Sequence, residues 1–131
     1  ILGQRHLNMD VRFTRRFSAG LSPEEYGKVL ADTKIALTPE GYVSNNSFRF
    51  FEAARAGCIL ISCKQSDDWY YTEFPGFFVD SWAELLSIIR RLRKNPEEAN
   101  LIHQKILQYY NTYCAEESVA NYIKKVISES N

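Results

Sequence analysis

Hydrophobic and polar positions along the chain follow two periods, one typical of helices and one typical of buried strands. Short apolar runs without alternation, at residues 34–38, 58–62 and 77–80, predict strands buried on both faces, as in a parallel sheet. Met9 to Phe13 is a weaker strand candidate. Apolar residues at helical spacing form four further stripes: Tyr26, Val29 and Leu30; Leu85, Ile88, Ile89 and Leu92; Ile102, Ile106 and Tyr109 or Tyr110; and Val119, Tyr122, Ile123 and Val126.

Three helix starts carry capping signals. Ser22-Pro-Glu-Glu and Ser81-Trp-Ala-Glu each place a hydroxyl at the cap and a glutamate three residues later, which is the capping-box pattern. Asn95-Pro-Glu-Glu is a variant with asparagine as the cap. Strands and helices alternate up to about residue 80, and the last 50 or so residues read as nearly all helical. This order is typical of the α/β class.

Composition and charge narrow the class of protein. The chain has 131 residues, of which 45% are hydrophobic and 14% aromatic, so it has the apolar side chains that disordered chains lack. Its 16 basic and 16 acidic residues balance, which argues against a nucleic-acid partner bound through overall charge. The length suits one domain with one core, over residues 1–131, without repeats or linkers.

The cysteines and the apolar runs bear on location. Cys58, Cys63 and Cys114 are odd in number and have no CxxC spacing, and the only histidines are His6 and His103. A disulfide framework or a zinc site is therefore not expected, and the cysteines are expected to pack as small hydrophobic residues. No signal peptide or membrane span of about 20 apolar residues is visible. We therefore expect a cytoplasmic location, with or without peripheral attachment to a membrane.

The segment from Thr38 to Cys58 is the best candidate for chemistry. A buried strand is expected to end at Thr38, a loop rich in small polar residues follows, and a helix is expected from about Ser47 to Ala56, with Gly57 ending it. In parallel sheets, ligands bind where strand ends meet helix N-termini, and the free backbone N–H groups there suit a phosphate. Arg49 adds a charged fork for a phosphate.

Structural alternatives exist for these residues. Ser47 and the residues before it are helix caps in many proteins, and Arg49 with Glu52 has the spacing of a surface ion pair. Phe48, Phe50 and Phe51 are expected in the core. Further alternatives concern residues outside the segment: His6 and His103 as structural residues, Asp67-Asp68 as solvated turn residues, and Trp69, Tyr70 and Tyr71 as either core or sugar contacts.

The order of motifs resembles the donor-binding half of GT-B glycosyltransferases, and most closely the exostosin-like group and related glycosyl transferases group 1. The resemblance runs from about residue 10 to the end. It rests on Gly20-Leu-Ser-Pro-Glu-Glu-Tyr, Lys34-Ile-Ala-Leu-Thr-Pro-Glu-Gly, Ser47-Phe-Arg-Phe-Phe-Glu-Ala-Ala-Arg-Ala-Gly-Cys-Ile and the helix from Ser81. The fold that it implies is a Rossmann-like parallel sheet with flanking helices and a helical C-terminal region, which is the C-terminal half of a GT-B fold.

The resemblance implies a role for each matching residue. Glu52 would accept hydrogen bonds from the ribose hydroxyls of a UDP- or GDP-type sugar donor. Ser47 and Arg49 would hold the diphosphate, so that Arg49 and Glu52 would serve catalysis as well as binding. The remaining candidate binding residues are Gly41, Ser44 and Asn46 in the loop and Gly20 and Leu21 near the base. Such folds bind the donor without an obligatory metal or other cofactor.

Two departures qualify the resemblance. Ser44 stands eight residues before Glu52, where many retaining relatives carry a second glutamate, which favours an inverting, exostosin-like relative. The acceptor half is also absent, so the chain is expected to be a fragment that is inactive without an N-terminal domain for the glycan or other acceptor. The alternative is a noncatalytic Rossmann-like nucleotide-binding or protein-interaction domain.

Overall fold

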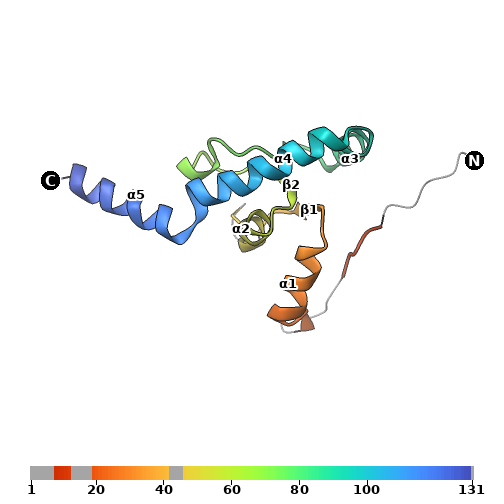
Figure 1. The fold of residues 1–131 in the computed structure, drawn as a ribbon, viewed down its shortest axis with the longest axis horizontal. Coiled ribbons are helices and arrows are strands. Elements are labelled where there is room, and N and C mark those ends of the chain that lie inside the picture. The colour runs from red at the N-terminus through yellow and green to blue at the C-terminus, as the bar shows by residue number, and fades with distance from the viewer. Residues whose placement is uncertain (1–7, 13–18, 42–45, 131) are drawn as a thin grey trace, which may run out of the picture.

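The computed structural model describes residues 8–12, 19–41 and 46–130. Figure 1 shows a small sheet surrounded by helices, with the last helix extending away from the rest. The elements run in the order α1 (Pro23–Ala31), β1 (Ile35–Thr38), α2 (Phe48–Arg55), β2 (Ile59–Cys63), the 3₁₀ turn η2 (Trp69–Tyr71), β3 (Phe77–Val79), the 3₁₀ turn η3 (Trp82–Glu84), α3 (Leu85–Lys94), α4 (Pro96–Tyr109), the π turn η4 (Tyr110–Cys114) and α5 (Glu116–Glu129).

The described strands form one parallel sheet in the order β1-β2-β3. Ile35 pairs with Ile59 and Ile61 pairs with Phe77, so all strands point the same way and their carboxyl ends share one edge. The predicted α/β, Rossmann-like class is therefore confirmed. The weaker strand candidate is wrong over Met9 to Arg12, which form no regular structure, and Phe13 lies outside the described residues.

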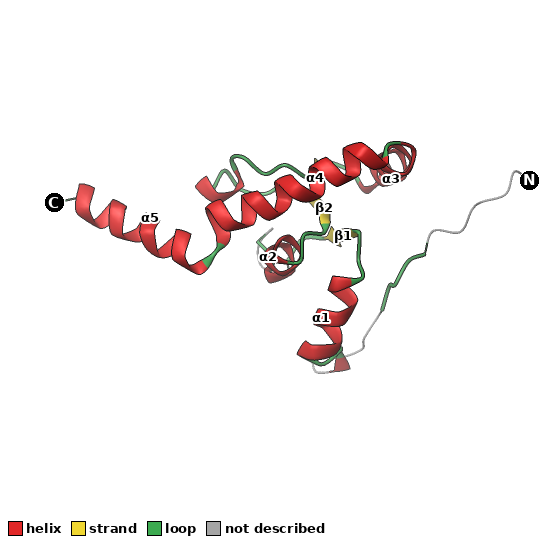
Figure 2. Ribbon diagram, viewed as in Figure 1, coloured by secondary structure: helices red, strands yellow, loops and turns green. Residues whose placement is uncertain are grey.

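Helices cover both faces of the sheet (Figure 2). Successive side chains of a strand point to opposite faces. Leu60 of β2 accordingly packs in a cluster with residues of α2 and α4, whereas its neighbour Ile61 packs in a second cluster with Val79 and Ile89, which belong to β3 and α3. The prediction that the strands are buried on both faces holds best for β2, whose first four residues are all buried.

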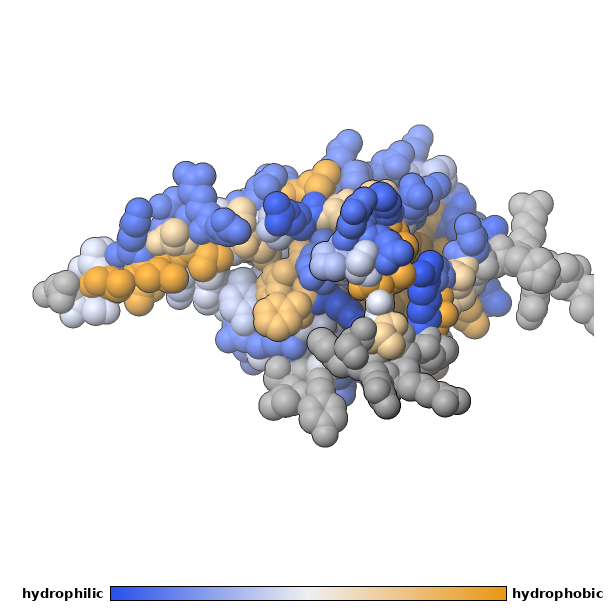
Figure 3. All heavy atoms as spheres, turned by 90° about the horizontal axis from the view of Figure 1, so that it is seen from below, coloured by the Kyte–Doolittle hydropathy of each residue, from blue (hydrophilic) through white to orange (hydrophobic). Residues whose placement is uncertain are grey.

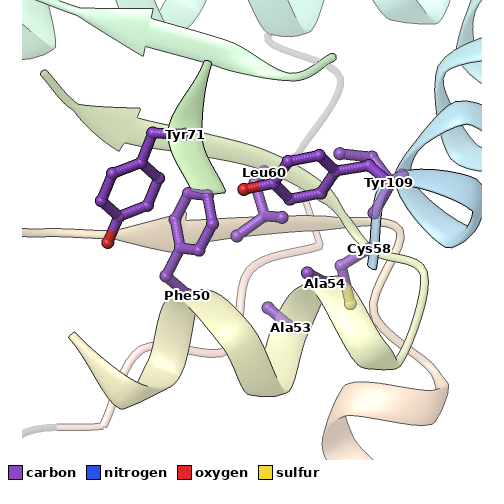
Figure 4. Close-up of a cluster of buried hydrophobic side chains, with 8 residues drawn as sticks. Phe50, Ala53, Ala54, Cys58, Leu60, Tyr71 and Tyr109 are labelled. Carbon is purple, nitrogen blue, oxygen red and sulfur yellow. The ribbon is translucent and has the colours of Figure 1, made fainter. Parts of the chain in front are cut away.

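The larger cluster centres on Phe50, which is fully buried (Figure 4). Ala53 and Ala54 are buried on the same helix, and their small side chains let α2 lie close to β2. The rings of Tyr71 and Phe74 approach Phe50 with centroid distances of 5.1 and 4.9 Å. Edge-on and tilted ring pairs of this kind stabilise a core beyond the area that they bury. This packing fixes the position of α2 on the sheet.

The structure confirms two of the three predicted caps. The Ser22 Oγ accepts a hydrogen bond from the Glu25 N–H, and the Glu25 carboxylate accepts one from the Ser22 N–H, which starts α1. The Ser81 box is also present, although it opens η3 before α3 begins. Asn95 precedes α4 as predicted, but its side chain makes no capping hydrogen bond, since its backbone lies outside the usual cap conformation.

The C-terminal region is helical, as predicted, but α5 does not bury its apolar stripe. Tyr122, Ile123 and Val126 are 39%, 51% and 42% exposed. Figure 3 shows an orange, hydrophobic surface along the projecting helix. The predicted helical stripe is therefore present but largely uncovered, because α5 extends beyond the sheet (Figure 1). No helix in the described ranges has the length and apolar content to cross a membrane.

Candidate functional site

The N-terminus of α2 lies at the edge of the sheet where the strands end. Strand β1 ends at Thr38, the chain turns, and α2 starts at Phe48 and runs back so that β2 begins beside the start of β1. The free N–H groups of the first helical turn therefore face the edge at which open parallel sheets bind ligands. The predicted position of the N-terminus of α2, at the carboxyl edge of the sheet, agrees with this geometry.

Ser47 occupies the N-cap position of α2 without acting as a side-chain cap. Its backbone is extended, as in most caps, but its hydroxyl makes no capping hydrogen bond with the first turn. Ser22 and Ser81, by contrast, both use their hydroxyls in this way. The structure therefore does not support the interpretation of Ser47 as a helix cap alone. The backbone N–H groups at the start of α2 receive no hydrogen bond acceptor from the Ser47 hydroxyl.

Arg49 and Glu52 are both exposed on α2 and form no ion pair with each other. The alternative of a simple surface pair is therefore wrong. Both side chains instead act on Tyr26 of α1. Burial raises the pKa of the Tyr26 hydroxyl, the negative charge and hydrogen bond of Glu52 raise it further, and the positive charge of Arg49 opposes them. The structure thus brings together a phenol, a carboxylate and a guanidinium.

Tyr26 is a candidate site residue that the sequence reasoning missed. The sequence placed it only in the apolar stripe of α1, where a half-buried aromatic residue is ordinary. Its hydroxyl can donate or accept a hydrogen bond, and it lies within reach of Glu52. Tyr26 lies outside the segment from Thr38 to Cys58, and no signal in the sequence pointed from α1 to that segment.

Asn46 is fixed by residues of η2. The Tyr71 hydroxyl donates a 2.9 Å hydrogen bond to the Asn46 Oδ1. Asp68 accepts hydrogen bonds from the Ser66 and Tyr70 hydroxyls, and these, together with one from Asn46, lower the pKa of the Asp68 carboxyl. Asn46 was predicted as a ligand contact, and in the structure its side chain connects the start of α2 to the chain after β2.

The other predicted binding residues occupy different places. Gly41 is half-buried after β1, at the carboxyl edge. Gly20 and Leu21 come just before the first turn of α1, with Gly20 exposed and Leu21 half-buried. Ser44 lies outside the described residues.

A buried polar chain runs along the strand ends. The Ser62 hydroxyl donates to the Thr38 carbonyl at 3.1 Å, and the Gln65 amide donates to the Ser62 hydroxyl at 2.9 Å and to the Cys63 carbonyl at 3.0 Å. The Thr38 hydroxyl and the Gln65 Oε1 are buried and have no hydrogen-bond partner in the described parts of the chain. Buried polar atoms without partners are costly, so this edge retains unused hydrogen-bonding capacity.

The structure also tests the predictions for the phenylalanines of α2 and for Cys58. Phe48 is 87% exposed, so the expectation that it lies in the core is wrong, whereas Phe50 is fully buried and Phe51 packs against the same cluster. Cys58 is buried as a small hydrophobic residue, and burial raises the pKa of its thiol. Among the described residues, no three histidine, cysteine or acidic side chains gather closely enough to hold a metal ion.

Comparison with known families agrees with the α/β fold. Residues 1–126 match the model of a family described as glycosyl transferase-like. The match spans nearly the whole chain, so the protein belongs to the glycosyl transferase-like family, which confirms the resemblance to group 1 glycosyltransferases. Comparisons with curated proteins and with solved structures gave no match.

Proposed function

We propose that this chain is the donor-binding domain of a glycosyltransferase with two Rossmann-like domains, and that it binds a UDP- or GDP-type sugar at the N-terminus of α2. The observation that carries the proposal is the start of α2, where the Ser47 hydroxyl does not cap the helix and where Arg49 and Glu52 do not pair. These groups lie at the carboxyl edge of the sheet. The Ser47 hydroxyl is available to a ligand because it does not cap α2, and Arg49 and Glu52 are available because they do not pair with each other.

Each group has a distinct role in the proposed complex. The first-turn N–H groups, the Ser47 hydroxyl and the Arg49 guanidinium bind the diphosphate. The Glu52 carboxylate accepts hydrogen bonds from the two ribose hydroxyls, since one carboxylate offers two acceptor oxygens. Gly41, Ser44 and Asn46 complete the loop around the phosphates, and Gly20 and Leu21 lie near the base.

The reaction that fits this arrangement is glycosyl transfer. The bond between the sugar C1 and the diphosphate oxygen breaks, the diphosphate leaves with the electron pair, and an acceptor hydroxyl forms the new bond to C1. The proton of that hydroxyl goes to a base on a second domain. Arg49 and the start of α2 stabilise the negative charge that grows on the leaving diphosphate, without an obligatory metal ion. The acceptor is a glycan or another hydroxyl-bearing molecule, and the chain alone does not catalyse transfer.

Nucleotide titration tests the donor site. We expect millimolar or tighter binding of UDP or GDP, which raises the melting temperature by mass action. Glu52→Gln should weaken that binding by about 10- to 100-fold, because a hydrogen bond to a charged group contributes about 1.5–3 kcal/mol. Arg49→Gln should weaken it similarly.

Matched controls separate the site from general charge effects. Arg55→Gln changes an arginine at the other end of α2, and Glu97→Gln changes an exposed glutamate in the first turn of α4. Neither should alter nucleotide binding. If neither UDP nor GDP shifts the melting temperature or any backbone amide signal in NMR spectra, the proposal is wrong and the noncatalytic alternative takes its place.

A further inference from the structure

The last helix, α5, contacts the rest of the protein on one side and leaves an apolar side uncovered. Tyr122 stacks on Trp69 of η2 with ring centroids 4.0 Å apart, which holds one side of α5 in place. Ile123 and Ile127 remain 51% and 60% exposed, and no residue of α5 is buried. Figure 1 shows that this helix projects away from the sheet. Its apolar side is therefore open to a partner.

The length of α5 makes packing on that side important for its stability. The helix has 14 residues, and isolated helices of about 12–15 residues are only marginally stable in water. In proteins, most of the stability of a helix comes from packing of its apolar face. A partner that covers the exposed side of α5 would therefore stabilise the helix itself.

The exposed residues of α5 have the spacing of a coiled coil. Ala120, Ile123 and Ile127 are all exposed and follow one another at intervals of three and four residues, so they form one seam along the helix. Glu117 and Lys124 are seven residues apart, which is one full repeat. They therefore occupy equivalent positions on the same flank of the seam. This spacing is typical of a helix that pairs with another helix.

The charges on this flank are complementary to those of a second α5. Glu117 and Lys124 are exposed, and neither forms an ion pair with any part of the chain that the structure describes. In an antiparallel pair of identical helices, equivalent flanks face each other, so Glu117 of one copy lies opposite Lys124 of the other. The twofold axis of such a pair repeats the contact. The charge pattern thus favours a second copy of this chain as the partner.

The other flank of the seam is apolar and borders a hollow. Val119 and Val126 lie on this flank. Val119 lines, together with Ile123 and Trp69, a hollow of about 350 Å³ between α5 and the rest of the chain. In the arrangement that places Glu117 opposite Lys124, Val126 of the second copy comes opposite Val119, at this hollow. The apolar flank and the charged flank therefore favour the same antiparallel arrangement.

We propose that this chain binds a second copy of itself through α5, as an antiparallel helix pair with twofold symmetry. Ile123 and Ile127 form the apolar centre of the interface, and Glu117 of each copy pairs with Lys124 of the other. The interface uses none of the residues proposed to bind the nucleotide, so it stands or falls independently of the donor site. Because two short helices bury a small area, we expect a weak dimer with a Kd in the micromolar range.

Sedimentation equilibrium of the full chain, from micromolar to submillimolar concentration, tests the apolar part of the interface. We expect a monomer–dimer equilibrium. Ile127→Glu should raise the dimer Kd by at least about tenfold, because it places a charge in the apolar centre. Leu101→Glu is the matched control, since Leu101 is 51% exposed on α4, and it should leave the Kd unchanged. Circular dichroism checks that both variants remain folded.

Charge reversal tests the antiparallel arrangement. Glu117→Lys and Lys124→Glu each place like charges opposite one another in the dimer, so each variant alone should dimerise about tenfold more weakly. An equal mixture of the two variants should form a dimer about as tight as that of the unaltered chain, because opposite charges again face each other. Lys125→Glu is the control and should have little effect, since Lys125 pairs with Glu129 of its own helix, on the side away from the seam.

Three results would overturn the proposal. A chain that stays monomeric up to submillimolar concentration would mean that a different partner covers α5. A dimer that Ile127→Glu leaves intact would mean that another surface forms it. If Ile127→Glu breaks the dimer but the mixed charge variants do not restore it, the two helices do not pair in the antiparallel arrangement.

Discussion

At the scale of single residues, two phenylalanines in α2 have opposite environments although they lie two positions apart. Phe50 is fully buried at the centre of the aromatic cluster, whereas Phe48 is 87% exposed. Two positions correspond to roughly 200° around a helix of 3.6 residues per turn, so the two side chains lie on opposite sides. Burial of the Phe50 ring therefore stabilises the folded state, whereas the Phe48 ring contributes little because it lies at the surface, at the start of α2.

Alanine substitutions measure this difference. Phe50→Ala should lower the free energy of unfolding by about 3–5 kcal/mol, because it removes a large buried ring and leaves a cavity. Phe48→Ala should change it by no more than about 0.5 kcal/mol, as for most exposed positions. Urea denaturation of both variants gives the values. Similar losses in the two variants would show that Phe48 is buried in the folded protein.

At the scale of elements, the end of α2 determines how the helix joins β2. Gly57 has a φ of 76°, and its carbonyl lies 2.5 Å from the His103 Nδ1 of α4. That conformation favours glycine, because the Cβ atom of any other residue would clash with the backbone there. His103 is thus a structural residue at this junction, in keeping with the expectation from the sequence.

Two glycine-to-alanine substitutions test this role. In Gly57→Ala the new Cβ would lie 2.7 Å from the His103 ring, and the strained φ adds about 1–2 kcal/mol, so the free energy of unfolding should fall by at least that much. Gly27→Ala, inside α1 with nothing within 4 Å of the new Cβ, should raise it by about 0.5–1 kcal/mol. Chemical denaturation compares them, and a stabilising Gly57→Ala would contradict the strain argument.

At the scale of the whole molecule, buried tyrosines connect the sheet to the C-terminal helices. Tyr109 of α4 is buried, and its hydroxyl donates to the Tyr70 carbonyl of η2. Tyr71 is buried against Phe50 and bonds to Asn46. Burial raises the pKa of both tyrosines, because the ionised phenolate loses its hydration in the core. The folded state therefore keeps both rings neutral.

This arrangement predicts a loss of stability at alkaline pH. The folded pKa of each tyrosine is raised above the unfolded value of about 10, so the stabilisation is fully present below that pH and is lost progressively as the pH rises above it. Urea denaturation between about pH 8 and pH 11 should show the free energy of unfolding falling most steeply near the upper end.

A conservative variant assigns the effect to the core. Tyr109→Phe should be less stable at neutral pH by about 1 kcal/mol, from the lost hydrogen bond, and should show a shallower alkaline slope. Tyr113→Phe removes a hydroxyl that bonds to the Glu73 carboxylate at the surface, and it should change the slope less, since solvent screens that bond. An unchanged slope in Tyr109→Phe would mean that other groups control the alkaline transition.

The sequence by itself determined which segments become helices and strands. Local signals are sufficient for that step: the capping box at Ser22, the apolar run of β2 and the glycine after α2 each act within a few residues. The candidate loop and the start of α2 also followed from the sequence, because a polar segment between a buried strand and a helix has a fixed place in a parallel sheet.

Only the tertiary structure decided which side chains meet. Tyr26 of α1 meets Arg49 and Glu52 of α2 although β1 separates the two helices in the chain, and no local pattern in the sequence records that meeting. The exposure of Phe48 and of the α5 stripe likewise depends on which elements lie opposite them. Apolar residues at helical spacing indicate that one face of a helix is apolar. Only the packing of the whole chain determines whether that face is covered.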